Sequence, residues 1–401
     1  MTPAAALQYE RDPREILADK IAMPLRVEAI SDFDSFRNLK PAWDRLVKES
    51  KIGHPFLTHD WICSWWECFG AGRTLTIVMV SQGGELIGIA PLMISRTKIY
   101  GIPVRELGSI SNDHTPRFDF IVSGDPAAVM EAIWIHLWER RREWDVMKLC
   151  QLESGSATLE HLAGLAAGYS CQLDTWPSTD SPYLSLNGSF EDHLAKLPRG
   201  LRANLRRRMK RLEEIGPVEF EQVSSERMID EALADAFLME AGTWKGAAGT
   251  AIACDHELTR FYAAIAQRAA RQGTLYFTFL RLDGKRIAFD LSLIYNQRLF
   301  KLKPGYLQRY HACSPGQELT TMTIRDAFAR GLSEVDFLGS ADEWKLAWTK
   351  TVRKQCWAYV FKNDLLGSLL HFAKFRLAPY LRGKIPTKVH ITIRSTREAR
   401  A

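Results

Sequence analysis

The segment His311–Phe328, which reads HACSPGQELTTMTIRDAF, combines residues that begin a helix with residues that can bind a phosphate group. Ser314 is a favourable N-cap, Pro315 suits the first helical position, and Gln317 stands where a capping box needs it. These residues predict a helix that begins near Pro315. Most helices begin in this way without binding a ligand, so a purely structural interpretation stays open.

The same segment has the features of a phosphate-binding turn. Gly316 would let a ligand approach the backbone closely, because it has no side chain. The unpaired amides and positive potential of a helix N-terminus attract an anion. Arg309 and His311 lie just upstream and would add charge or a hydrogen bond. From the residues alone, a phosphate site and a plain helix start are about equally supported.

Four residues near this segment have side chains suited to group transfer: Asp290, Tyr306, Asp336 and Lys345. Asp290 lies in the apolar stretch RIAFDLSLI, so its carboxylate faces either solvent or a reaction centre, where it would act as a general base. Tyr306 either donates a proton at a reaction centre or packs as an aromatic side chain. Asp336 and Lys345, in DFLGSADEWK, either bind and deprotonate an acceptor amine or hydroxyl or serve as a helix cap and its ion-pair partner.

Two polar segments elsewhere are candidates for substrate binding. The loop Ser111–Phe120 contains Asp113, His114 and Arg117, which either hold a turn through Asx hydrogen bonds or recognise an acceptor. Arg206 belongs to RGLRANLRRRMKR, an amphipathic helical pattern whose basic face is either solvated or in contact with an anionic partner. The Asp and His spacing is not that of a metal site, so no metal is predicted.

A repeated pattern predicts the elements that would position these residues. The segments Leu75–Ile94 and Leu275–Ile294 align without a gap at an offset of 200 residues, and each reads as an apolar strand, a tight turn and a second apolar strand. A helical stretch precedes each hairpin, and a helix and a strand follow it. This order predicts an α/β (α+β) fold with two mixed sheets flanked by helices, joined at the turn-rich segment Ser178–Asn187.

Composition limits the class of protein. The 401 residues carry a formal net charge of +6, and residues Asp364–Ala401 alone hold eight lysines and arginines against two acidic residues, so no DNA partner is predicted for the body of the chain. The seven cysteines form no Cys-x-x-Cys pair, and no apolar run is long enough for a signal or membrane span, which predicts a cytoplasmic protein. The basic, amphipathic tail either docks on the sheet or contacts the inner face of an anionic membrane.

A set of residues in the second half resembles the pattern of a known family: Tyr306, Ser314-Pro315-Gly316, Leu319, Gly331, Asp336-Phe337, Gly339 and Lys345, with the Arg-rich segment Arg202–Arg211 before them. The pattern is similar to that of the cellulose-biosynthesis-type acetyltransferases, a tandem-GNAT family distantly related to the Fem peptidyltransferases. The chain departs from it at Trp344, where the family often has Tyr, and it lacks the second glycine of ordinary GNAT loops.

The resemblance implies two tandem GNAT-like domains. The expected organisation is a leader at residues 1–24, a degenerate acceptor-side domain at 25–180, an acyl-CoA-binding domain at 181–362, and a basic amphipathic tail at 363–401. In such domains, the pyrophosphate of acyl-CoA lies at the start of the helix that follows the fourth strand.

The expected function is that of an acyl-CoA-dependent N- or O-acyltransferase, with acetyl-CoA or another acyl-CoA as co-substrate and direct transfer to a small-molecule or saccharide acceptor, as in exopolysaccharide or envelope biosynthesis. The expected roles are catalytic for Asp290, Tyr306, Lys345 and Asp336, cofactor-binding for Arg309, His311, Ser314, Pro315, Gly316 and Gln317, and substrate-binding for Asp113, His114, Arg117 and Arg206. The alternatives are a Fem-like transferase that uses aminoacyl-tRNA, the one case with a tRNA partner, and a non-catalytic double-GNAT scaffold.

Overall fold

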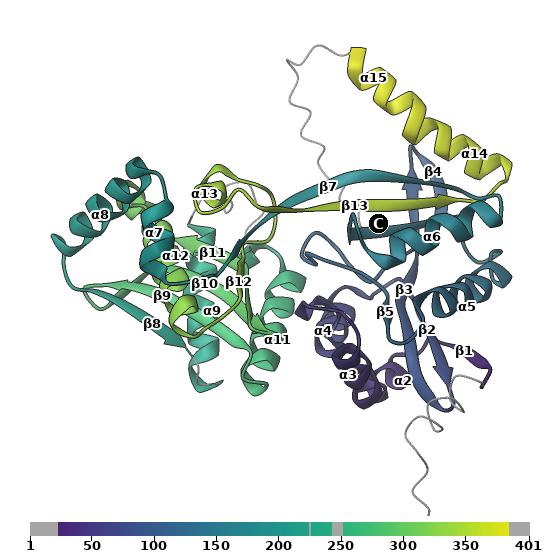
Figure 1. The fold of residues 1–401 in the computed structure, drawn as a ribbon, viewed down its shortest axis with the longest axis horizontal. Coiled ribbons are helices and arrows are strands. Elements are labelled where there is room, and N and C mark those ends of the chain that lie inside the picture. Colours follow the sequence, from purple (N-terminus) through teal and green to yellow (C-terminus); the bar gives the residue numbers. More distant parts are fainter. Residues whose placement is uncertain (1–22, 224–225, 243–251, 385–401) are drawn as a thin grey trace, which may run out of the picture.

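The computed structural model describes residues 23–223, 226–242 and 252–384. The predicted leader falls almost entirely outside these residues, as do residues 385–401 of the predicted tail. The chain forms two lobes, and the long strands β7 (Gln172–Ser185) and β13 (Val352–Phe361) run from one lobe to the other (Figure 1). Among the described residues, no helix is long and apolar enough to cross a membrane.

The first lobe is built from the following elements in chain order: β1 (Leu25–Ile30), α2 (Phe33–Asn38), α3 (Lys40–Glu49), η1 (Pro55–Leu57), α4 (His59–Phe69), β2 (Thr74–Gln82), β3 (Glu85–Ile99), β4 (Ile102–Ser109), β5 (Ile121–Val122), α5 (Pro126–Glu139), β6 (Val146–Glu153) and α6 (Ala157–Gly168).

The second lobe and the C-terminal helices follow β7: α7 (Phe190–Lys196), α8 (Arg199–Glu213), β8 (Val218–Val223), α9 (Glu226–Ala241), η2 (Ile252–Cys254), α11 (His256–Arg271), β9 (Leu275–Leu282), β10 (Lys285–Tyr295), β11 (Arg298–Tyr306), η3 (Gln308–Cys313), α12 (Pro315–Ala329), β12 (Glu334–Asp336), α13 (Glu343–Leu346) and, after β13, α14 (Leu365–Phe372), the π turn η4 (Ala373–Leu377) and α15 (Ala378–Lys384).

The described strands form one mixed sheet in the order β1-β2-β3-β4-β6-β13-β7-β12-β11-β10-β9-β8, with β5 paired to β3. The predicted repeat is confirmed in its register, because Leu75 pairs with Met93 in the first hairpin and Leu275 pairs with Leu293 in the second. Each hairpin is followed by an antiparallel strand that is itself paired in parallel with the next, β4 with β6 and β11 with β12. The predicted fold class is therefore confirmed.

The segment predicted as a turn-rich join is strand instead. Residues 178–185 belong to β7, which pairs with β13 through its N-terminal part and with β12 through Tyr183–Ser185. The prediction of turns was wrong because small polar residues and prolines were taken as turn signals, whereas the segment does lie where the chain passes from the first lobe to the second. Pro177 instead faces the register shift between Lys354 and Cys356, where the ladder is already irregular.

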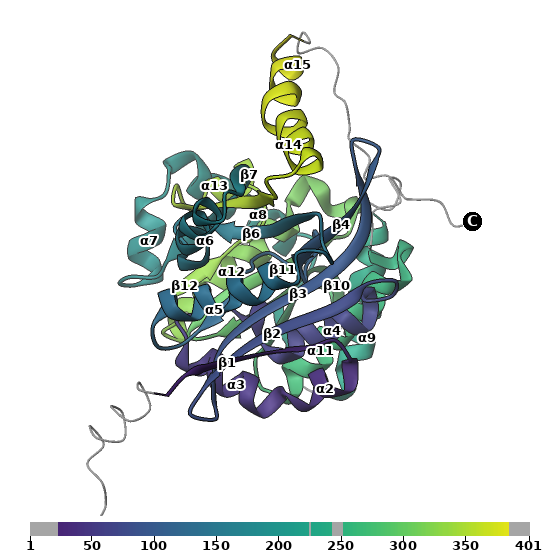
Figure 2. The same ribbon diagram turned by 90° about the vertical axis from the view of Figure 1, so that its right-hand side faces the viewer.

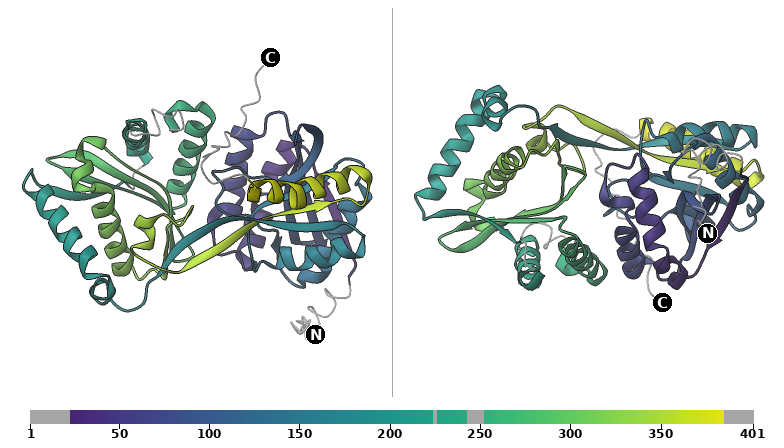
Figure 3. Two further views of the ribbon diagram at one scale, coloured as in Figure 1. Left: turned by 90° about the horizontal axis from the view of Figure 1, so that it is seen from above. Right: turned by 60° about the horizontal axis from the view of Figure 1, so that its bottom comes forward.

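The two lobes exchange strands. β13 comes from the end of the second lobe's sequence, yet it lies between β6 and β7 in the sheet of the first lobe, as the view from above also shows (Figure 3). In return, the end of β7 completes the second lobe's sheet beside β12. The predicted domain limits at residues 180 and 362 stay a prediction, since the sheet does not divide where the sequence does.

The hydrophobic core crosses between the lobes. Trp61 of α4 meets Phe261 of α11 with ring centroids 5.4 Å apart, and Phe56 meets Phe300 of β11 at 5.6 Å. All four rings are buried, and full burial of such side chains contributes about 1.5–3 kcal/mol each. This shared packing fixes the lobes relative to each other and so fixes the shape of the space between them.

Candidate active site

The strands β11 and β12 are paired over a short stretch only and then separate. They pair in parallel from Arg298 to Phe300, opposite Glu334 to Asp336, and then β12 ends while β11 continues to Tyr306. On its other side, β11 has a bulge against β10, with Leu302 as the extra residue between Lys301 and Lys303. A bulged residue leaves the regular ladder, so its backbone groups become available to a ligand.

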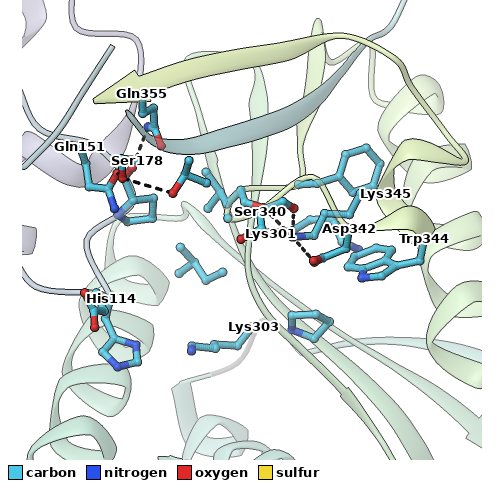
Figure 4. Close-up of a pocket in the computed structure, with 18 of the residues that line it drawn as sticks. His114, Gln151, Ser178, Lys301, Lys303, Ser340, Asp342, Trp344, Lys345 and Gln355 are labelled. Carbon is cyan, nitrogen blue, oxygen red and sulfur yellow. Dashed lines mark hydrogen bonds and ion pairs between the residues drawn. The ribbon is translucent and has the colours of Figure 1, made fainter. Parts of the chain in front are cut away.

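A cavity of about 720 Å³ opens at this parting, between the two lobes (Figure 4). Its wall contains the end of β11, the segment after β12, the loop of the first lobe and the exchanged strands. The residues that line it include Asp113, His114, Trp176, Tyr262, Lys301, Leu302, Lys303, Pro304, Ser340, Asp342, Trp344, Lys345, Gln355 and Trp357.

His114 connects the two lobes at the edge of this cavity. Its Nδ1 lies 2.9 Å from the hydroxyl of Tyr262 on α11, and the two rings meet edge to face. Burial raises the pKa of the Tyr262 phenol well above its usual range, with the nearby charge of Glu240 as the smaller cause, so the phenol stays neutral. Lys303 places its ammonium 5.2 Å from the centre of the same ring. The predicted loop residues Asp113 and His114 thus lie on the cavity wall.

A second cavity of about 300 Å³ lies at the start of α12 and is lined by Glu240, Gly305, Tyr306, Gln308, His311, Ser314, Gly316 and Gln317. Pro304 and Trp344 line both cavities, so the two are neighbours. The structure therefore brings together Tyr306, His311, Ser314, Gly316 and Gln317, five of the predicted residues. Arg309 is exposed and stacks on Tyr310 instead.

The start of α12 differs from the prediction in its capping. Pro315 is the first helical residue as predicted, but Ser314 adopts a left-handed conformation with φ of 46°, and none of the described side chains caps this end. Gln317 forms no capping box, since its side-chain oxygen accepts a hydrogen bond from Trp348 at 3.3 Å. The predicted N-cap was wrong because a left-handed serine cannot aim its hydroxyl at the first turn. No side-chain cap from the described residues therefore occupies this helix start, while the amides of Ser314 and Gln317 donate to the carbonyls of His311 and Ser314, each at 2.9 Å.

Tyr306 and His311 form a pair beside this helix start. The Tyr306 hydroxyl lies 3.0 Å from Nδ1 of His311, and the rings stack with centroids 6.2 Å apart. A Cβ at Gly316 would lie 3.4 Å from the Tyr306 ring, which shows how closely the helix start approaches the end of β11. The hydroxyl is therefore held in a fixed place on the wall of the second cavity.

Asp290 lies behind the cavity wall. Its carboxylate is buried in an ion pair with Lys301 and accepts a hydrogen bond from Ser292 at 2.7 Å. Lys301 also reaches Thr320 of α12 at 3.3 Å, and it is Lys301 that lines the cavity. A buried pair of this kind is costly to break, since one uncompensated charge remains. Asp290 therefore does not line the cavity itself and contacts it only through its ion-pair partner Lys301.

Asp336 and Arg117 form a buried ion pair between the lobes. Asp336 also accepts hydrogen bonds from Arg353 at 3.0 Å and from the Leu338 amide at 3.0 Å, and it is fully buried. Arg117 is 1% exposed. Neither side chain reaches the space available to a substrate, so the predicted catalytic role of Asp336 and the predicted substrate contact of Arg117 do not fit their positions. Sequence periodicity could not show that these charges would meet each other.

Lys345 holds the loop that follows β12. Its ammonium donates to the carbonyls of Leu338 and Ser340, each at 2.9 Å, and lies 3.0 Å from the carboxylate of Asp342. These three partners match the three donors of an ammonium group. Lys345 lines the larger cavity, and its geometry is that of a residue that shapes the wall.

Arg206 lies at a third cavity, of about 390 Å³, between α7, α8 and α12, away from the two described above. Glu318 of α12 also lines it and is 1% exposed, with one carboxylate oxygen unpartnered among the described residues. Burial raises the pKa of Glu318 to about 8, although the positive charge of Arg208 opposes the shift. Arg206 and the acceptor loop therefore do not share one site.

Several lining residues were not predicted as site residues. Lys301 and Lys303 alternate at the end of an apolar strand, which is a signal that the sequence offered. Trp176, Gln355 and Trp357 come from the exchanged strands, and no local pattern indicates that they reach this cavity. Within the described ranges, no group of His, Cys, Asp and Glu residues is arranged to hold a metal ion.

Comparisons with known proteins bear on the fold of the chain. A family profile described as an acetyltransferase (GNAT) domain matches residues 199–346. No curated protein matches the chain. Among solved structures, FemX superposes with a TM-score of 0.58 at 11% identity, over 86% of this chain and 99% of that chain.

Two further solved structures share the arrangement. The C-terminal domain of a protein named as a lysylphosphatidylglycerol synthetase from Agrobacterium fabrum has a TM-score of 0.51 at 11% identity, over 84% of this chain and 96% of that one. A conserved protein of unknown function from Bacteroides thetaiotaomicron has a TM-score of 0.50 at 11% identity, over 85% and 100%. Likeness at such identities concerns the fold alone. The chain thus has a two-domain GNAT fold, and its residues 199–346 match a profile described as an acetyltransferase (GNAT) domain.

Proposed function

We propose that the protein is an acyl-CoA-dependent N- or O-acyltransferase, with acetyl-CoA as the first donor to test. The observation that carries the proposal is the pair of neighbouring cavities that leads from the uncapped N-terminus of α12 to the parting of β11 and β12. A helix N-terminus attracts a diphosphate, and an extended thioester arm fits beside a strand whose edge is unpaired. A match of residues 199–346 to an acetyltransferase domain supports the same donor.

The donor's parts have matching places on this path. The diphosphate would lie against the backbone of residues 314–317, and the thioester near the bulge at Leu302. The acceptor's nitrogen or oxygen attacks the thioester carbonyl carbon, the carbon–sulfur bond breaks, and the thiolate leaves with the electron pair. A backbone amide at the bulge would stabilise the negative charge on the carbonyl oxygen, and the proton that the acceptor loses would pass through solvent to the departing thiolate, because Tyr306, held by His311, lies at the diphosphate end of the path.

The acceptor would occupy the larger cavity between the lobes. Aromatic faces from Trp176, Trp344 and Trp357 suit the apolar face of a sugar ring, and Asp113 and His114 add polar groups from the first lobe. These features support a small-molecule or saccharide acceptor, and an exopolysaccharide or envelope saccharide is the specific form of the proposal. Sequence composition favours a cytoplasmic location for the reaction.

A second candidate is a transferase that uses aminoacyl-tRNA. It is favoured by the similarity of the fold to FemX and by α8, on which Arg199, Arg206 and Arg207 are exposed. A polyanionic donor bound there would dissociate steeply as the salt concentration rises. The aminoacyl-tRNA candidate places the bound polyanion on α8, whereas the acyl-CoA candidate places the diphosphate at the start of α12.

Isothermal titration calorimetry separates the candidates. CoA and acetyl-CoA titrated into the full chain should bind with a dissociation constant of about 1–100 μM, the range common for enzyme substrates. Charged tRNA, titrated at low salt, should give no comparable heat. Binding of tRNA without binding of CoA would reject the first candidate in favour of the second, and binding of neither would leave a non-catalytic scaffold.

A further inference from the structure

The C-terminal helical segment exposes a row of apolar side chains. Leu365, Leu369, Phe372, Leu377, Tyr380 and Leu381 are between 42% and 88% exposed. They lie on α14, the π turn η4 and α15, a segment that starts at the first lobe and projects away from it (Figure 2). Large apolar side chains that gather on one projecting segment, and are not scattered singly, indicate a contact surface.

The π turn keeps this row on one face. In an α-helix of 3.6 residues per turn, the position that continues Leu365, Leu369 and Phe372 would be Arg376. The π turn Ala373–Leu377 adds one residue to the turn and moves Leu377 into line, with Tyr380 and Leu381 one turn later. Pro379 favours this irregularity because it has no N–H to donate to the carbonyl four residues earlier.

The opposite face fixes the segment to the first lobe. Leu370 is fully buried, and Phe375 packs against Phe361 and Tyr359 of β13 with ring centroids 6.2 and 5.9 Å apart. The Nε2 atom of His371 forms a hydrogen bond with the carboxylate of Asp174 on β7, at a distance of 2.5 Å. The apolar row therefore cannot turn inward without breaking these contacts.

A basic groove adjoins the start of the row. The groove has a volume of about 540 Å³, and its charged lining consists of Arg105, Arg141, Arg142, Lys362 and Asp364. Asp364 lines the groove and directly precedes Leu365, so the groove lies at the start of the row. Arg141 and Arg142 are exposed at its rim. From Asp364 to Ala401 the sequence adds eight lysines and arginines against two acidic residues, a net charge of +6.

We infer that α14–α15 docks in the plane of an anionic lipid surface, with the apolar row among the acyl chains and the basic groove toward the headgroups. An apolar stripe beside clustered lysines and arginines is the pattern of a helix that lies on a membrane, and the positive charge selects anionic lipid. A protein partner that covers only the apolar row would leave the adjoining groove and the positive charge unused. The inference does not depend on the proposed acyltransfer.

Vesicle co-sedimentation of the full chain tests the inference. The protein should bind vesicles of phosphatidylcholine with about 30% phosphatidylglycerol, bind phosphatidylcholine alone about tenfold or more weakly, and be released by high salt. The double variant Leu369→Glu/Phe372→Glu should lose about tenfold or more of this binding. Arg141→Glu/Arg142→Glu should reduce the preference for anionic vesicles.

The matched control is Ile215→Glu/Leu238→Glu, which changes two apolar residues that are 57% and 70% exposed elsewhere on the molecule. This control should bind vesicles like the unmodified protein, and circular dichroism should show that all variants are folded. Unchanged binding by the Leu369/Phe372 variant, or no binding of anionic vesicles by the unmodified protein, overturns the inference. A dimer in light scattering that the Leu369/Phe372 variant dissociates, without vesicle binding, would assign the face to a second copy instead.

Discussion

Helix α5 of the first lobe and helix α12 of the second follow corresponding hairpins, and both begin with proline, but their N-termini are completed differently. In α5 the carboxylate of Asp125 accepts a hydrogen bond from the Ala127 amide at 3.0 Å. In α12 the residue at the same place is Ser314, left-handed and without a described side-chain cap. A carboxylate at a helix start excludes a phosphate by charge and by position. The same framework thus closes the site in one lobe and leaves it open in the other.

The difference extends into the first turn. Counted from the two prolines, Val129 in α5 corresponds to Glu318 in α12, and both are 1% exposed. The first lobe fills this position with an apolar side chain, as packing favours, while the second lobe keeps a carboxyl group there whose pKa burial raises to about 8. The comparison shows that, within the described residues, α5 has a side-chain cap and an apolar side chain where α12 has neither, and has a buried carboxyl group instead. Variants of α5 and α12 test this contrast, and one further variant tests the contact between the lobes.

The largest loss of folding stability is expected from a variant of the buried ion-pair network between the lobes. Asp336→Ala would leave Arg117 and Arg353 without their shared buried carboxylate, and removing one partner of a buried ion pair costs about 3–5 kcal/mol. Urea unfolding should show this loss of stability. The control Asp34→Ala removes an ion pair that is exposed at both ends and should change stability by less than about 1 kcal/mol. Equal effects would mean that the buried network does not hold the lobes together.

Blocking the open helix start should abolish donor binding without unfolding the protein. A Cβ at Gly316 makes an ordinary contact with Tyr306, so a larger side chain such as that in Gly316→Phe must enter the cavity. The affinity for CoA should fall about 100-fold or more, which corresponds to about 2.7 kcal/mol. The matched variant Ala127→Phe changes the corresponding, exposed position of α5 and should leave the affinity unchanged. Calorimetry that finds CoA affinity intact in Gly316→Phe would refute the assignment of the site.

Replacing Glu318 with glutamine should stabilise the protein in alkaline solution. The folded state raises the pKa of this carboxyl from 4.5 to about 8, so its contribution to stability is complete below about pH 4.5 and is lost as the pH rises through about 8. Glutamine does not ionise. Glu318→Gln should therefore gain about 1–3 kcal/mol over the unmodified protein near pH 9, and the gain should shrink toward pH 5.

Thermal unfolding across this pH range measures the effect. Glu191→Gln is the control, because Glu191 lines the same cavity but is exposed. A gain that is independent of pH, or one that the control shares, would show that the Glu318 carboxyl is not the cause.

The smallest changes in folding stability are expected from variants of the two N-cap residues, Asp125 and Ser314. Asp125→Ala removes the side-chain cap of α5 and should cost about 1 kcal/mol. Ser314→Gly should instead stabilise by up to about 1 kcal/mol, because glycine adopts a positive φ without steric cost. Chemical denaturation of the two variants gives the comparison directly. Opposite signs are expected, and a loss of stability in both would mean that Ser314 has a capping role after all.

The predictable part of the fold was local. The hairpins at Leu75 and Leu275 could be predicted because the alternation of apolar residues and the tight turns lie within twenty residues of each other. The start of α12 at Pro315 was predictable for the same reason. The exchange of β7 and β13 was not, since a strand pattern carries no information about which distant strand will pair with it.

The site shows the same limit. The residues around Ser314 and Tyr306 were found because they are neighbours in sequence, and the structure keeps them together. For Asp336 and Asp290, the sequence indicated a charge in an apolar strand without indicating its partner, and each partner, Arg117 or Lys301, is supplied by another element. The sequence shows which residues carry a charge. Whether such a residue has a catalytic or a structural role depends on tertiary contacts, which the sequence does not show.

The place of β13 in the first lobe has a consequence for biosynthesis. A ribosome releases the chain from its N-terminus onward, so residues 25–185 emerge well before residues 352–361, the strand that separates β6 from β7. Until then the nascent first lobe has two unsatisfied strand edges, which invite pairing with other chains. Its maturation must wait until Phe361 has emerged, and a premature stop before Val352 would yield a fragment suited to aggregation and to capture by chaperones.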